Sequence, residues 1–107
     1  MTTPQDVFAQ MPEHFLPDKA KGVNVVIQFD LSGENGGQWY LTVADGTCRI
    51  DKGRADAPAV TISMADSDYV AMSTGAANAI QLFMSGKIKL EGNMMLAQSM
   101  QAWFDQN

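Results

Sequence analysis

The sequence contains few of the residues from which covalent crosslinks and metal sites are built. Cys48 is its single cysteine and His14 is its single histidine. One cysteine excludes a disulfide within the chain, which is typical of proteins from reducing compartments. One histidine without a neighbouring second ligand does not match the usual zinc patterns. We therefore expect structural roles for both residues, and we predict neither a metal nor another cofactor.

Long apolar runs are also absent. No stretch reaches the ~20 apolar residues that a membrane-spanning helix needs. The first residues, MTTPQDVF, have neither the basic nor the apolar region of a secretory signal. A net charge of −5 and a pI near 4.5 disfavour binding to the phosphates of nucleic acid. The sequence therefore predicts a cytoplasmic protein that neither binds nucleic acid nor inserts stably into a membrane.

Motifs of nucleotide binding and of catalysis are missing as well. Gly33, Gly36 and Gly37 follow neither the dinucleotide-binding spacing nor that of a phosphate-binding loop. Asp66 and Asp68 flank a serine at an expected helix start, where acidic side chains stabilise the helix dipole. This position favours a structural role over an acid–base pair. We predict that the chain is not an enzyme.

The apolar residues that are present follow a regular pattern along a chain of 107 residues. That length fits one domain, residues 1–107, with a single core. Helical spacing over residues 3–16 predicts an N-terminal helix, with prolines at its start, middle and end. Alternation of apolar and polar residues predicts strands over 23–31, 38–44, 47–51 and 59–64. The first three should form an antiparallel meander, in which an Asp-Gly pair makes the second turn.

In the C-terminal half the apolar period changes to that of helices. We expect Asp66 to cap a helix that ends at Gly75, and Asn78 to cap a second, short helix. A short strand over 87–91 follows, and Asn93 is expected to cap a last helix. Because the strands have one apolar face, all helices should cover that face. The sequence therefore predicts an α+β domain with one sheet.

The last helix is rich in large and flexible apolar side chains. The chain has eight methionines, and Met94, Met95 and Met100 fall here together with Trp103 and Phe104. Methionine fills irregular space and adapts to varied partners. The helix therefore completes either an ordinary core or a cavity around an apolar ligand, and composition alone favours the ordinary core.

The C-terminal half resembles the sterol carrier protein 2 family. The resemblance rests on these positions: Thr74-Gly75, Gly86-Lys87-Ile88-Lys89-Leu90, Gly92-Asn93-Met94 and Leu96-Ala97. It extends more loosely over the rest of the chain. It implies a five-stranded, mostly antiparallel sheet, with helices on one face and an apolar tunnel between them. In the family this tunnel holds fatty acids, fatty acyl-CoA, sterols or phospholipids. Because the chain lacks the C-terminal peroxisomal signal of many eukaryotic members, the resemblance implies a standalone, bacterial-type member.

The resemblance also implies which side chains line the tunnel. They come from the helices and the fifth strand of the C-terminal half: Val70, Ile80, Phe83, Met84, Leu90, Met95, Leu96, Met100, Gln101, Trp103 and Phe104. Gln101 falls where family members often place a glutamine, which could bind a carboxylate or a hydroxyl. The alternatives are plain core for the apolar residues and a solvated helix position for Gln101.

The basic residues offer a second possible contact with a ligand. Lys52, Arg54, Lys87 and Lys89 could form a cluster that binds an acidic lipid group near the tunnel mouth. The alternative is a solvated, charged face of the sheet.

Three functions are compatible with these features. The first is non-enzymatic binding or transfer of apolar lipids, with a lipid ligand and at most transient membrane contact. The second is an accessory factor that presents polyprenylated quinone precursors to biosynthetic enzymes. The third is a protein-interaction domain with a filled core and no ligand. We favour the first function, because soft apolar walls suit a ligand site of broad tolerance.

Overall fold

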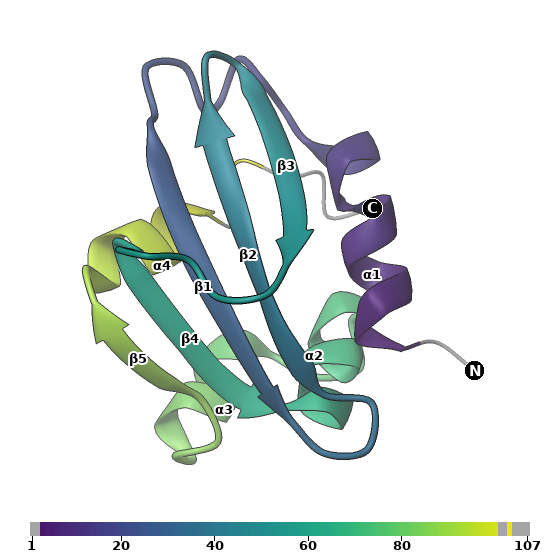
Figure 1. The fold of residues 1–107 in the computed structure, drawn as a ribbon. Helices are drawn as coiled ribbons and strands as arrows, with labels where there is room; N and C mark the ends of the chain where they lie inside the picture. Colours follow the sequence, from purple (N-terminus) through teal and green to yellow (C-terminus); the bar gives the residue numbers. More distant parts are fainter. Residues whose placement is uncertain (1–2, 101–102, 104–107) are drawn as a thin grey trace.

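One sheet forms the centre of the fold (Figure 1). The computed structural model describes residues 3–100 and residue 103. Within them, the strands are β1 (Val25–Ser32), β2 (Gly37–Ala44), β3 (Thr47–Lys52), β4 (Val60–Ala65) and β5 (Lys89–Gly92), in the sheet order β3-β2-β1-β4-β5. β1 and β4 pair in parallel, and the other neighbours pair antiparallel. The predicted meander, the α+β class and the mostly antiparallel sheet are confirmed.

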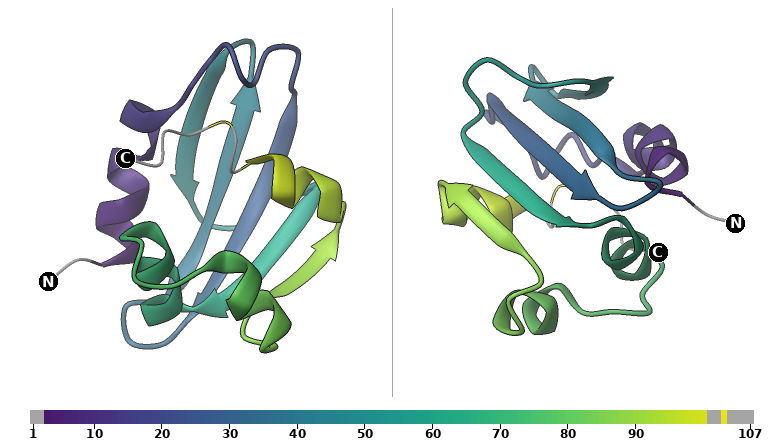
Figure 2. Two further views of the ribbon diagram at one scale, coloured as in Figure 1. Left: turned by 180° about the vertical axis from the view of Figure 1, so that it is seen from behind. Right: turned by 60° about the horizontal axis from the view of Figure 1, so that its bottom comes forward.

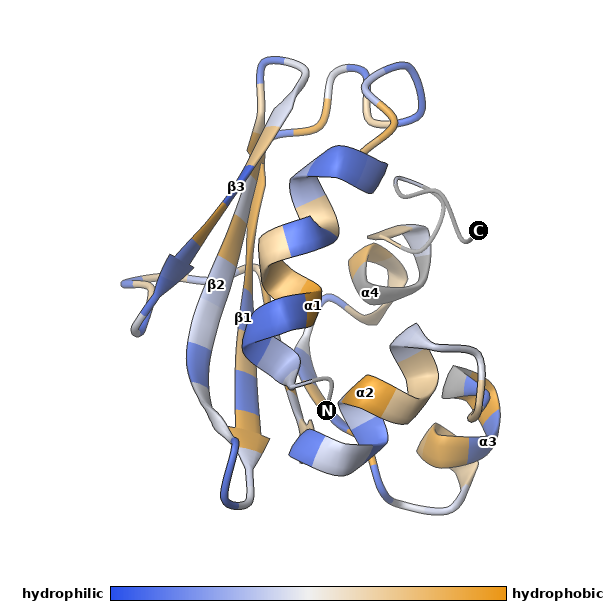
Figure 3. Cartoon of the chain, turned by 90° about the vertical axis from the view of Figure 1, so that its right-hand side faces the viewer, coloured by the Kyte–Doolittle hydropathy of each residue, from blue (hydrophilic) through white to orange (hydrophobic). Residues whose placement is uncertain are grey.

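All described helices lie on one side of this sheet (Figures 2 and 3). They are α1 (Pro4–Gln10), the 3₁₀ helix η1 (Met11–His14), α2 (Asp66–Ser73), α3 (Ala79–Met84) and α4 (Met94–Met100). The N-terminal segment is divided near Pro12, as its sequence predicts, because a proline inside an α-helix removes a hydrogen bond. The predicted cover of one face by helices is confirmed.

The helix-facing side of the sheet carries the core. The alternating residues of β1, β2 and β4 are buried there: Ile27, Phe29, Leu31, Trp39, Leu41, Val43, Val60, Ile62 and Met64. Phe8 of α1 packs onto them and is only 2% exposed. Its ring centroid lies 5.3 Å from that of Phe29, 4.9 Å from that of Trp39 and 4.9 Å from that of Tyr69. Phe8 therefore joins the sheet, α1 and α2 in one aromatic cluster.

The opposite face of the sheet is crossed by the connection between β3 and β4 (Figure 1). Gln28 of β1 points to this face and is nevertheless fully buried beneath the connection. Its side-chain amide nitrogen donates to the carbonyl of Gly53 over 3.1 Å, and its oxygen accepts from the amide of Ala55 over 2.8 Å. These two bonds hold the crossover against the sheet.

The predicted helix caps are confirmed in two of three cases. The side chain of Asn78 accepts hydrogen bonds at the start of α3, and that of Asn93 does so at the start of α4. The third prediction is wrong, because Ala65 occupies the cap position of α2 and Asp66 is its first residue. The carboxylate of Asp66 accepts instead from the amides of Ser67 and Asn35. It therefore ties the loop between β1 and β2 to the helix start.

Replacing Phe8 should destabilise the protein strongly. Phe8→Ala leaves a cavity at the junction of α1, α2 and the sheet, and we expect the free energy of unfolding to fall by about 3–5 kcal/mol. Urea denaturation measures this change. The neighbouring Ala9 is exposed, so Ala9→Ser is the matched control and should change stability by less than about 0.5 kcal/mol. Equal effects of the two substitutions would contradict the central role of Phe8.

Candidate functional site

The candidate ligand site lies between α2 and α4, over β4 and β5. Both helices pack on β4, and α4 also packs on β5, but the two helices make little direct contact with each other. Figure 3 shows α4 apart from the group formed by α2 and α3. The apolar side chains that α2, α4 and β5 contribute to this region therefore decide whether it is a closed core or a site that can adapt to a ligand.

Those side chains are mostly flexible and only partly buried. Met72 of α2, Leu90 of β5, and Leu96 and Met100 of α4 pack against the fully buried core without being enclosed by it. We call these four residues the seam. Unbranched and γ-branched side chains of this kind change rotamer easily and adapt to the shape of a neighbour. The seam can therefore accommodate a guest at lower cost than the tightly packed aromatic cluster.

Trp103 closes the core beyond α4. Its side chain is buried, and its carbonyl accepts a hydrogen bond of 2.6 Å from the amide of Leu16. This bond connects the end of the chain to the segment after η1. Gln101 and Phe104, which the resemblance places in the tunnel wall, lie outside the described residues.

The predicted tunnel residues fall into two groups in the structure. The first group is partly or fully buried and consists of Val70, Leu90, Leu96, Met100 and Trp103. Trp103 belongs to the core, and Leu90, Leu96 and Met100 pack against it. The others are exposed side chains of α3 and α4: Ile80 (68%), Phe83 (42%), Met84 (81%) and Met95 (78%). The structure places this second group on the outer surface, which corrects the expectation of an enclosed position for all of them.

The misassignment in α3 has a simple physical reason. The sequence pattern predicts an inward stripe of Ile80, Phe83 and Met84, but Leu82 is the buried side chain of this helix. α3 spans only six residues, Ala79–Met84. In so short a helix the spacing of apolar residues does not fix which side faces the sheet. The signal that sequence reasoning missed is local: in the turn directly after the helix, the carbonyl of Leu82 accepts a hydrogen bond from the amide of Lys87.

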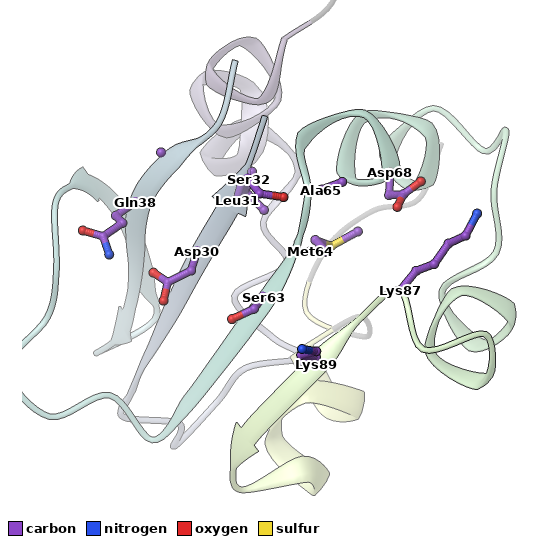
Figure 4. Close-up of a pocket in the computed structure, with 11 residues that line it drawn as sticks. Asp30, Leu31, Ser32, Gln38, Ser63, Met64, Ala65, Asp68, Lys87 and Lys89 are labelled. Atoms are coloured by element: carbon purple, nitrogen blue, oxygen red, sulfur yellow. The ribbon is translucent and has the colours of Figure 1, made fainter. Parts of the chain in front are cut away.

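One hollow among the described residues, here called the polar groove for its charged lining residues, is also lined by the apolar side chains of Leu31 and Met64 (Figure 4). It has a volume of about 650 Å³ and opens broadly to solvent. Its polar lining comes from Asp30, Gln38, Ser63, Asp68, Lys87 and Lys89. A second hollow of about 350 Å³ lies beside the crossover, where Tyr40 and Arg54 contribute to it. Neither hollow is an enclosed apolar cavity.

The four basic residues considered as a possible cluster do not all lie together. Lys52 ends β3 and Lys89 begins β5, which are the two opposite edges of the sheet. Arg54 pairs instead with Asp30 over 3.6 Å, and the ammonium group of Lys52 lies 5.8 Å from the ring centroid of Trp39. Only Lys87 and Lys89 share a lining, that of the polar groove.

The ionisable groups of the described residues bear on whether a metal or a reactive side chain could act here. Among the residues that the structure describes, no group of three His, Cys, Asp or Glu side chains could hold a metal ion. Burial raises the pKa of the Cys48 thiol and that of the Tyr69 hydroxyl, so both groups stay protonated at neutral pH. A protonated and partly buried thiol is a poor nucleophile. The site is suited to apolar contact.

No helix in the described part of the chain has the length and apolar character needed to cross a bilayer.

Known proteins match this chain at the level of family and of fold. Residues 6–105 match the model of the SCP-2 sterol transfer family. The chain is 35% identical over 103 residues to the hydroxysteroid dehydrogenase-like protein 2 of Bos taurus, covering 95% of this chain and 25% of the bovine protein. It therefore spans about a quarter of that relative.

Two solved structures share the fold. The sec-alkylsulfatase Pisa1 from Pseudomonas sp. superposes with a TM-score of 0.85 at 17% identity, over 97% of this chain and 16% of the sulfatase. Sterol carrier protein 2 from Aedes aegypti, solved in complex with the C16 fatty acid palmitate, superposes with a TM-score of 0.71 at 20% identity. That match covers 99% of this chain and 98% of the mosquito protein. At these identities the likeness concerns the fold.

The exposure of the methionines predicts the order in which they oxidise. Met84 and Met95 are largely exposed, whereas Met64 is buried in β4. In dilute hydrogen peroxide we expect Met84 and Met95 to form sulfoxide at least about ten times faster than Met64, because peroxide must reach the sulfur. Peptide mass spectrometry over a time course measures the rates. Similar rates for Met64 and Met84 would contradict the exposed position of α3.

Proposed function

The chain belongs to the SCP-2 sterol transfer family, and we propose that it binds one long-chain apolar lipid between its helices and its sheet, without catalysing a reaction. A fatty acid is the first candidate; fatty acyl-CoA, sterols and phospholipids complete the proposed ligand set. The observation that carries the proposal is the seam, whose four partly buried side chains pack against the core from α2, β5 and α4, while the two helices make little direct contact. The fold shared with a palmitate-binding sterol carrier protein supports it.

Binding would proceed by widening the seam. Since α2 is held by α1, β4 and β1, and α4 by β4 and β5, rather than by each other, they can separate without breaking the sheet. An acyl chain that buries about 300 Å² of apolar surface gains several kcal/mol gross at about 25 cal/mol per Å². Part of this gain is lost to ordering of the chain. We therefore propose moderate affinity and broad tolerance for chain length.

The role that follows is that of a carrier. Relatives of this chain carry the domain within longer proteins, among them a sulfatase and a dehydrogenase-like protein. A domain with an apolar site and no chemical centre in its described part would supply a lipid to another protein or store it. We propose this role for the domain that the chain forms, in the cytoplasm.

Two measurements on the purified, untagged chain test the proposal. Mass spectrometry of an organic extract identifies any copurified lipid, and native mass spectrometry gives its stoichiometry. A fatty acid or acyl-CoA near one per chain is the expected result. A prenylated quinone would favour instead a role in presenting quinone precursors. A protein that is empty and also refuses added palmitate would overturn lipid binding and leave a protein-interaction domain.

A substitution in the seam tests where the lipid binds. Leu96→Ala removes three carbon groups of apolar contact from α4 and should weaken palmitate binding about fiftyfold, at roughly 0.8 kcal/mol per lost group. Titration with a fluorescent fatty acid, followed by palmitate competition, measures the affinity. Lys52→Ala, at the far edge of the sheet, is the control and should leave the affinity unchanged.

The fold of each variant is checked by circular dichroism. If folded Leu96→Ala binds palmitate as tightly as the wild type, the lipid does not occupy the seam.

A further inference from the structure

Strand β5 forms an edge of the sheet that no other described strand covers. It pairs with β4 on one side only, and Lys89, Glu91 and Gly92 are exposed. Figures 1 and 2 show it at the rim of the molecule. An exposed edge strand offers unpaired backbone groups to which another strand can add.

The register with β4 fixes which backbone groups of β5 point outward. The amide of Asn93 donates to the carbonyl of Ala59 over 3.0 Å, and the residues of an antiparallel strand face their neighbour alternately. Lys89 and Glu91 therefore direct their amides and carbonyls towards β4, whereas Leu90 directs its own away from it. The outer edge can accept one further antiparallel strand, centred on Leu90.

The charges of β5 are complementary to a second copy of the same strand. Leu90 packs against the core, so Lys89 and Glu91 lie on the helix-free face, and the ion pairs found among the described residues do not include them. In an antiparallel pair with Leu90 opposite Leu90, each Lys89 lies opposite Glu91 of the other copy. These positions form non-hydrogen-bonded pairs, in which facing side chains are closest. The same register therefore satisfies the backbone at the centre and joins two pairs of opposite charges beside it.

Exposed apolar side chains lie beside both ends of this strand. The large apolar side chains that are exposed in the described part of the chain all belong to α3 and α4: Ile80, Phe83, Met84, Met94 and Met95. α3 precedes β5 and α4 follows it, and both lie on the same side of the sheet (Figure 2). Antiparallel pairing places the start of one β5 next to the end of the other, so α3 of each copy approaches α4 of the other copy. Clustered apolar side chains at the surface mark an area that another molecule covers.

We propose that two copies of the chain form a symmetric dimer by pairing their β5 strands antiparallel about Leu90. The two sheets would join into one continuous sheet, with the helices of both copies on the same face. The interface is isologous, because the same residues contribute from both copies. The dimer would be weak and dependent on concentration, because a four-residue strand and the ends of two short helices bury an area at the low end of specific interfaces.

The dimer goes beyond the proposed lipid binding and does not depend on it. Pairing uses the outer backbone edge and the surface charges of β5, whereas the lipid is proposed to contact the side chains of the seam. Self-association and palmitate binding can therefore fail separately.

The other edge of the sheet lacks these features. On β3, the charges of Arg49 and Asp51 are already paired within the strand over 2.8 Å. The 3₁₀ helix η1 packs against β3, and the exposed apolar side chains belong to the helices next to β5 in the chain. β3 is therefore the reference edge for a test of the dimer.

Sedimentation equilibrium of the full chain tests the dimer, and charge reversal tests its register. We expect a reversible equilibrium between monomer and dimer for the wild type. Glu91→Lys alone, or Lys89→Glu alone, should weaken association at least about tenfold, because symmetry places like charges opposite each other twice. A mixture of the two variants should form a heterodimer, because each lysine then faces a glutamate. Isotope labelling of one variant lets native mass spectrometry identify this heterodimer.

Matched variants separate β5 from the rest of the surface. Arg49→Glu reverses an exposed charge on β3 and should leave association unchanged. Met84→Gln should weaken association about threefold, because the side chain loses apolar contact with α4 of the other copy; an unchanged value would contradict the contact between α3 and α4. Circular dichroism checks the fold of each variant. If Glu91→Lys does not fold, Lys89→Glu alone provides the test, since its neighbour on β4 is the uncharged Ser63.

Three results would overturn the proposal. The first is a wild-type chain that stays monomeric at about 1 mM. The second is an Arg49→Glu variant that loses association as strongly as Glu91→Lys does. The third is a mixture of the two reversal variants that associates no better than either variant alone, which would exclude pairing about Leu90.

Discussion

The parallel pairing of β1 with β4 is the constraint from which the arrangement of the molecule follows. The antiparallel meander finishes with β3 at one edge of the sheet. The next strand, β4, pairs with β1 on the side away from β2 and runs parallel to β1. The connection therefore has to cross the sheet. It crosses on the helix-free face, where Gln28 holds it through bonds to Gly53 and Ala55. The other face is left free for the helices and for a single apolar core.

The core on the helix-covered face has a tight part and a looser part. The tight half of the core lies where α1 packs on the meander, and Phe8 fills it with aromatic contacts. The looser half lies over β4 and β5, where α2 and α4 approach the sheet without packing on each other. A lipid site belongs in the looser half because the cost of opening it is smaller there. α3 is placed beyond this region and presents its apolar side outward.

Family membership gives this arrangement a context. The same fold occurs as a nearly whole protein in the palmitate complex from Aedes aegypti and as a small part of a bacterial sulfatase. The fold therefore recurs both as a nearly whole protein and as a small part of a longer one. In this chain, burial raises the pKa values of Cys48 and Tyr69, so neither of these two groups is poised to react at neutral pH.

The sequence by itself determined the strands, the helix order and the helical side of the sheet. Alternation along β1, β2 and β4 is enforced by the two faces of a strand, so it survives into the structure unchanged. The Asn78 and Asn93 caps were equally readable, since capping is a local hydrogen bond. Tertiary structure alone decided that Ile80 and Met84 face outward, that Asp66 reaches the loop at Asn35, and that the basic residues are spread over both sheet edges. These features depend on how short elements are oriented by distant neighbours, and a six-residue helix carries too little periodic signal to fix its own orientation.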